Sequence, residues 1–157
     1  MYFQLRRDCR NWFSDIRDVF DVDFDIYYLC FVLGILGNRK NPNIGENTTD
    51  LVDYFPEVHR ASSRIQIGIM LHNAISSLGL AFTKENRNNI SKRIMDYIDA
   101  NSPSKMTDSG VKEMNAYASG GFEELIERFP DKPRTIEHFL VKYLEIIDDI
   151  ESKAERQ

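Results

Sequence analysis

The sequence has few cysteines and no long apolar run, and both shortages exclude classes of protein. Two cysteines, Cys9 and Cys30, occur among 157 residues, without the paired CxxC spacing of zinc sites. So few thiols predict a reducing cytoplasm, with both cysteines packing as small apolar residues rather than forming a disulfide. The richest apolar stretch, residues 26–36, has 11 residues. A membrane-spanning helix needs about 20 residues, so no membrane association is expected.

Motifs that identify enzymes and metal sites are also missing. The three histidines, His59, His72 and His138, are scattered and form no HExxH pattern. The sequence contains no nucleophile elbow, phosphate-binding loop or dinucleotide-binding fingerprint. We therefore expect a protein that is not an enzyme, with no catalytic residues, no cofactor, no metal and no small-molecule substrate.

The charge is mildly acidic, with 25 acidic and 20 basic side chains and a net charge of −5. This balance argues against a protein that coats nucleic acid by bulk attraction, although a local basic face remains compatible with it. Hydrophobic residues make up 42% of the chain and charged residues 29%, as in ordinary soluble proteins. Length and composition predict one globular domain over residues 1–157.

Apolar residues recur every three or four positions along most of the chain, which is the spacing of amphipathic helices, and no run alternates as a strand does. We predict an all-α fold, a compact bundle of about six helices. Residues 1–23 form an N-terminal extension with the first helix, and residues 38–50 form one long loop. The expected helices cover residues 4–13, 24–36, 57–78, the segment from Thr83 to Ile98, the segment from Ser109 to Phe129, and residues 135–150.

The longest expected helix carries an apolar stripe that we expect to face the core. Its members step by three and four residues, and His72 on or beside them is interpreted as a core histidine. The stripe consists of Ala61, Ile65, Ile69, His72 or Leu71, Ile75 and Leu78.

A glycine pair, Gly120-Gly121, interrupts a sequence that otherwise reads as helix. Each interior glycine costs about 1 kcal/mol relative to alanine, so the pair calls for a reason. Either one helix ends and another begins there, or the missing side chains let another backbone come close. The sequence leaves both explanations open.

The fourth expected helix is the one candidate surface for nucleic acid. Arginine, lysine and asparagine suit phosphates and base edges, and we expect them to share the outer face of this helix. A solvated helix face and a contact with an acidic protein explain the same residues. The candidates are Lys84, Arg87, Asn88, Lys92 and Arg93.

Two segments resemble small helical proteins associated with bacterial Dnd-type DNA phosphorothioation defence loci. Residues 33–42 (LGILGNRKNP) resemble the apolar helix, glycine, basic residues and proline near the start of those proteins. Residues 117–125 (YASGGFEEL) resemble their tyrosine, small residues, glycine pair and leucine-rich helix. The N-terminal extension and the long central helix pair depart from that pattern. The family offers no catalytic residues to transfer.

The resemblance implies a small accessory protein that works beside larger ATPases or nucleases in defence against phage. We therefore predict a non-catalytic cytoplasmic adaptor that docks on such a partner. The alternative is a DNA-contacting module that uses the basic helix at residues 84–93. The candidate docking residues are Arg39, Lys40, Pro42, Tyr117, Gly120 and Gly121.

Overall fold

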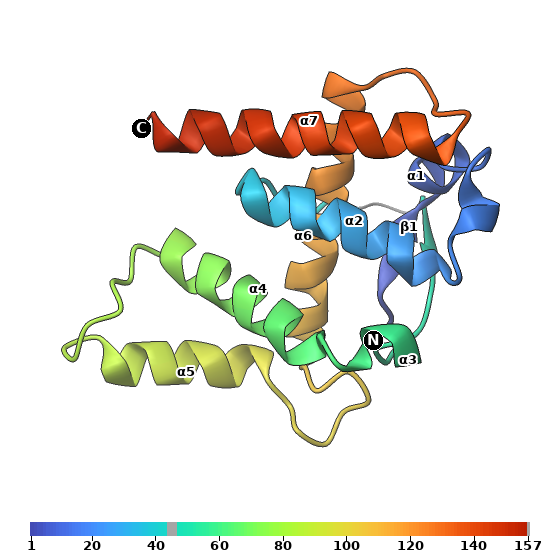
Figure 1. The fold of residues 1–157 in the computed structure, drawn as a ribbon. Helices are drawn as coiled ribbons and strands as arrows, with labels where there is room; N and C mark the ends of the chain where they lie inside the picture. The colour runs from blue at the N-terminus through green and yellow to red at the C-terminus, as the bar shows by residue number, and fades with distance from the viewer. Residues whose placement is uncertain (44–46, 157) are drawn as a thin grey trace. The chain divides into compact units, whose positions relative to one another are not determined.

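The computed structural model describes residues 1–43 and 47–156, and it is mostly helical (Figure 1). Seven α-helices and one two-stranded sheet occur in the described part of the chain, so the predicted helical class is confirmed. The chain divides into two compact units. One contains residues 1–3 and 52–114, and the other contains residues 4–51 and 115–157. The organisation as a single domain stays a prediction.

The second unit contains a short sheet that the sequence reasoning missed. Strand β1 (Gln4–Arg6) pairs antiparallel with β2 (Thr48–Asp50), with Leu5 opposite Thr49. The helix predicted over residues 4–13 is therefore wrong at its start, and α1 covers only Arg7–Trp12. The long loop predicted over residues 38–50 is likewise wrong at its end, where β2 lies; residues 44–46 of it are outside the described residues. Three-residue strands are too short for an alternating pattern to be recognised.

The core of the second unit is aromatic. Helix α2 (Asp23–Leu36) buries Phe24, Tyr27 and Phe31, and α7 (Ile136–Glu155) buries Phe139 and Tyr143. Both helices were predicted close to these bounds. The Tyr143 hydroxyl donates to the backbone carbonyl of Leu29 at 2.7 Å, which ties α7 to α2. Figure 1 shows these two helices side by side.

Trp12 of α1 connects the aromatic core to the rest of the unit. Its ring meets Phe13, Phe129 and Phe139 edge to face, with centroids 4.8, 5.4 and 6.1 Å away. A 3-10 helix, η1 (Arg17–Val19), follows α1 and leads into α2. At the start of α7 the Thr135 hydroxyl accepts the backbone N–H of His138 at 3.2 Å, so Thr135 is the N-cap of this helix.

The first unit contains α3 (Glu57–Arg60), α4 (Ser63–Ser77) and α5 (Arg87–Tyr97). The single helix predicted over residues 57–78 is thus wrong, because the chain turns at residues 61–62. There the Ser62 and Ser63 hydroxyls donate to the carbonyls of His59 and Arg60, at 3.2 and 2.8 Å. Such local bonds compete with the hydrogen bonds that would continue a helix. Helix α5 also begins four residues later than Thr83, and α4 and α5 pack together in this unit.

Helix α6 (Asp108–Arg128) is continuous through the glycine pair. It begins in the first unit and ends in the second. Of the two explanations for the pair, the helix junction is therefore excluded. Among the described residues, no helix is both long and apolar enough to span a membrane.

Candidate docking surfaces

The glycine pair lies in the part of α6 that belongs to the second unit, where α6 meets the backbone of α2 and of the segment after it. A Cβ atom added to Gly121 would overlap the carbonyl oxygen of Cys30 and lie 2.7 Å from the backbone nitrogen of Gly34. A Cβ added to Gly120 would overlap the Arg39 carbonyl and lie 2.7 Å from the Lys40 Cα. Both contacts are closer than a real Cβ tolerates, so the close-approach explanation is confirmed.

Backbone hydrogen bonds tie the segment after α2 both to α6 and to the end of α2. The N–H of Asn41 donates to the carbonyl of Ala116 at 2.9 Å, and the N–H of Arg39 donates to the carbonyl of Gly34 at 2.8 Å. The Lys40 ammonium lies 5.9 Å from the centre of the Tyr117 ring. The two segments that carry the family resemblance, residues 33–42 and 117–125, therefore pack against each other.

Arg39, in the segment after α2, pairs with a cluster of carboxylates on α6. Its guanidinium donates to the carboxylates of Glu124 at 3.0 Å and Glu127 at 2.7 Å, and it lies 3.4 Å from Glu123. The hydrogen bond from Arg39 lowers the pKa of Glu127. Burial opposes a low pKa at Glu124, but hydrogen bonds from Arg39 and Arg128 outweigh it and lower that pKa as well. The ion pairs of Arg39 thus attach the segment after α2 to α6.

These contacts decide which predicted docking residues can reach a partner. Tyr117, Gly120 and Gly121 are buried between α6 and its neighbours, and they offer no surface. Arg39 is half-buried, whereas Lys40 and Pro42 are exposed. The structure brings Arg39, Lys40, Tyr117, Gly120 and Gly121 together in one packing arrangement within the second unit.

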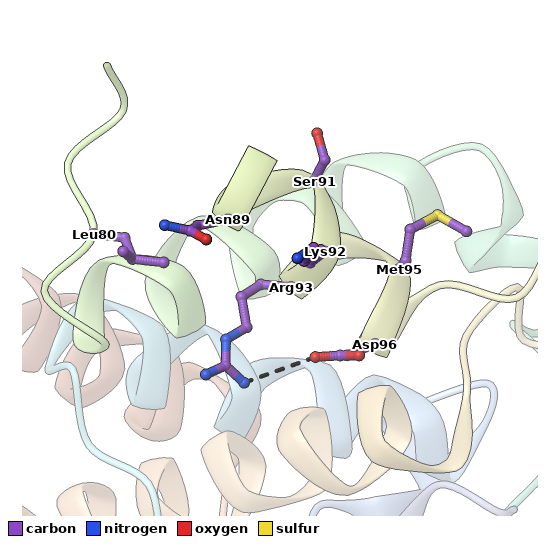
Figure 2. Close-up of a pocket in the computed structure, with 7 residues that line it drawn as sticks. All are labelled: Leu80, Asn89, Ser91, Lys92, Arg93, Met95 and Asp96. Atoms are coloured by element: carbon purple, nitrogen blue, oxygen red, sulfur yellow. Dashed lines mark ion pairs between the residues drawn. The ribbon is translucent and has the colours of Figure 1, made fainter. Parts of the chain in front are cut away.

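The five predicted nucleic-acid residues are all exposed in the first unit, but they do not share one face. Each residue of an α-helix turns about 100° from the last, so Lys92 and Arg93 point about 100° apart, and Arg87 lies about 120–140° from each. Figure 2 shows the side chains of Lys92 and Arg93 leaving α5 in different directions. Arg93 also lies 3.7 Å from the carboxylate of Asp96. The expectation of a single basic outer face is therefore wrong.

A surface hollow beside these residues mixes polar and apolar groups. Figure 2 shows the Met95 and Ser91 side chains pointing away from that of Arg93, and Asn89 and Leu80 at the left of the view. Met95 is 70% exposed. The hollow contains one ion pair, Arg93 with Asp96, and no concentration of one charge.

Helix α4 exposes the apolar residues that the sequence reasoning assigned to the core. Ile65 is 64% exposed and Ile69 is 41% exposed, and His72 follows at the same helical spacing. The Phe82 ring, itself 54% exposed, stacks on the His72 ring with centroids 5.0 Å apart and planes 3° from parallel. We call this set the α4 stripe; it consists of Ile65, Ile69, His72 and Phe82.

The expected core stripe is thus wrong for most of its members. Of the residues listed for it, Ile75 is fully buried, whereas Ala61, Ile65, Ile69, His72 and Leu78 are exposed. The buried face of α4 instead contains Gln66, Ile67, Met70 and Ala74. Both faces of α4 are apolar at helical spacing, so periodicity alone cannot say which of them is buried.

The two cysteines lie next to each other in the second unit. Cys9 and Cys30 are buried thiols with sulfur atoms 3.7 Å apart, and burial raises the pKa of Cys9 well above its usual value. A thiol in that state is a poor nucleophile. The described residues contain no group of three histidine, cysteine or carboxylate side chains placed to hold a metal ion.

Comparisons with protein-family models, with curated proteins and with solved structures gave no match to this chain.

Proposed function

We propose that the protein is a non-catalytic cytoplasmic adaptor that docks on a larger protein through the α4 stripe. The observation that carries the proposal is the row of large apolar side chains left exposed on α4. Ile65 and Ile69 lie one turn apart, and the stacked pair of His72 and Phe82 continues the row. Contiguous exposed apolar surface is typical of interaction sites.

The chemistry of α4 favours a protein partner over nucleic acid. Its sequence from Ser63 to Ser77 contains no carboxylate and one arginine, Arg64, which is exposed. Anchors at positions i, i+4 and i+7 are those that an amphipathic helix offers to a groove or to another helix. A stripe that is apolar and free of acidic groups fits a partner surface with apolar and acidic side chains.

The family resemblance supplies the proposed class of partner, a larger ATPase or nuclease of a phage-defence system. The resembling segments form the packing between α2 and α6, so they support a shared scaffold rather than a shared docking loop. The residues that would contact the partner lie elsewhere, on α4. The partner class therefore rests on the resemblance, and the docking face rests on the exposed stripe.

Photo-crosslinking in the native host tests this proposal. A benzophenone amino acid replaces Ile69 in the full chain, and a matched control carries it at Val19, which is 57% exposed on η1. We expect position 69 to capture one ATPase or nuclease, identified by mass spectrometry, and the capture to be lost when Ile65→Asp is added. Equal capture from positions 69 and 19, or none from position 69, would overturn the proposal.

DNA contact through the basic helix is the second candidate, favoured by the exposure of Lys84, Arg87, Asn88, Lys92 and Arg93. The combined change of the four cations to alanine is expected to weaken retention on duplex DNA and to reduce its salt dependence, because fewer counterions are released. Their divergent directions predict weak binding. If the wild-type chain is not retained at low salt, this candidate is excluded.

A further inference from the structure

Helix α7 has a second exposed apolar row, on the side away from its buried face. Its buried residues, Phe139, Tyr143, Ile146 and Ile150, pack into the core of the second unit. On the exposed side, Leu140 is 45%, Val141 56% and Leu144 59% accessible. We call these three residues the α7 stripe. They occupy the spacing that lets one helix pack against another.

The surroundings of the α7 stripe are acidic. Glu137, Asp148 and Glu151 are exposed on the same side of the helix, within about two turns of Leu144. Helix α4 differs from α7, because it contains no carboxylate and has the cation Arg64 exposed beside Ile65. This chain thus exposes two apolar rows, one on a helix with exposed carboxylates and one on a helix that contains none.

We propose that the α7 stripe of one copy packs on the α4 stripe of a second copy. This inference rests on the part of the proposed function that makes the α4 stripe a docking face, and it names a second occupant for that face. Pairing α7 with α7 would bring acidic groups together, and like charges across an interface disfavour a complex. Pairing α7 with α4 buries both apolar rows and places the carboxylates of α7 beside a helix that has none and that exposes Arg64. The second copy and the larger partner then compete for α4.

The test uses sedimentation of the full chain with one aspartate in each stripe. Ile69→Asp disables the α4 stripe and Leu144→Asp disables the α7 stripe, both at exposed positions where the fold is expected to survive. We expect the wild type to self-associate with rising concentration, each variant alone to stay monomeric, and an equimolar mixture of the two to form a 1:1 dimer. The mixture keeps one intact stripe of each kind.

Controls separate folding from association. Val19→Asp changes an exposed apolar residue outside both stripes and is expected to associate like the wild type. Ile65→Asp and Leu140→Asp repeat the mixture with independent substitutions, and circular dichroism checks that each variant is folded. A wild type that is monomeric at every concentration would overturn the inference. So would a mixture that stays monomeric, or a single variant that still associates.

The outcomes also separate this inference from the proposed function. If the wild type is monomeric but the crosslinker at position 69 captures a defence protein, the second-copy inference is overturned and the adaptor proposal stands. If the mixture dimerises and the crosslinker captures only the chain itself, the adaptor proposal fails and the α4 stripe is a self-association site.

Discussion

At the scale of single residues, Gly121 lies where the backbones of α2 and α6 meet. Because the atom that would clash is the Cβ itself, alanine is already too large, although α6 is helical there. We expect Gly121→Ala to lower the free energy of unfolding by about 1–3 kcal/mol, the usual cost of overpacking. Urea denaturation of the purified chain measures this change.

Gly68 in α4 provides the matched control, because a Cβ there would meet nothing within 4 Å. Gly68→Ala is expected to raise the free energy of unfolding by up to about 1 kcal/mol, through helix propensity alone. Equal effects at the two glycines would show that the approach of α2 to α6 is not the reason for the pair.

Asn115 is a second residue with a defined role in the second unit. Its side-chain oxygen accepts the buried Tyr27 hydroxyl at 2.8 Å and the backbone N–H of Gln4 at 3.1 Å. We expect Tyr27→Phe to cost about 1 kcal/mol, because it removes one hydrogen bond and leaves Asn115 bonded to Gln4. Asn115→Ala should cost more, since it removes the acceptor shared by two donors. Chemical denaturation that ranks the two variants the other way would contradict this assignment.

At the scale of elements, the attachment of the segment after α2 to α6 predicts how stability depends on pH. Arg39 and its neighbours lower the pKa of Glu124 and Glu127 below the ordinary value of 4.5. Near and below that pH the unfolded chain therefore binds more protons than the folded one. The stabilisation is fully present above about pH 4.5 and is lost as the pH falls through the lowered folded values.

Arg39→Gln should therefore flatten the decline in the free energy of unfolding below pH 4.5. Arg134→Gln, at an exposed arginine in the loop before α7, is the matched control and should leave the decline unchanged. Denaturation curves recorded across this pH range decide the matter. An unchanged slope in Arg39→Gln would show that the ion pairs contribute little to folding.

The elements also show how far the sequence could be interpreted. The positions of α2, α6 and α7 followed from the periodicity of their apolar residues. Periodicity did not predict the strand at Gln4, because that strand depends on its pairing with a distant segment. It also did not predict the break near Ser62, which depends on a local hydrogen bond of the serine hydroxyl. The α4 stripe was detected as apolar but assigned to the core, since periodicity identifies a face without saying what covers it.

At the scale of the whole molecule, the residues that stabilise the fold differ from the apolar residues exposed on α4. The second unit places Arg39, Tyr117 and the glycine pair inside its own packing, so these residues explain why the fold holds together. The first unit leaves Ile65 and Ile69 exposed at helical spacing. The docking residues expected from the sequence therefore differ from those that we propose on α4.

The central claim is that a partner binds through the apolar α4 stripe rather than through the basic residues of α5. Quantitative affinity capture from the native host, with three full-length baits, tests it directly. The baits are the wild type, Ile65→Asp with Ile69→Asp, and the combined alanine changes at Lys84, Arg87, Lys92 and Arg93. The account predicts that the double aspartate bait loses the specific partner and that the alanine bait retains it. Retention by the aspartate bait together with loss by the alanine bait would contradict the account.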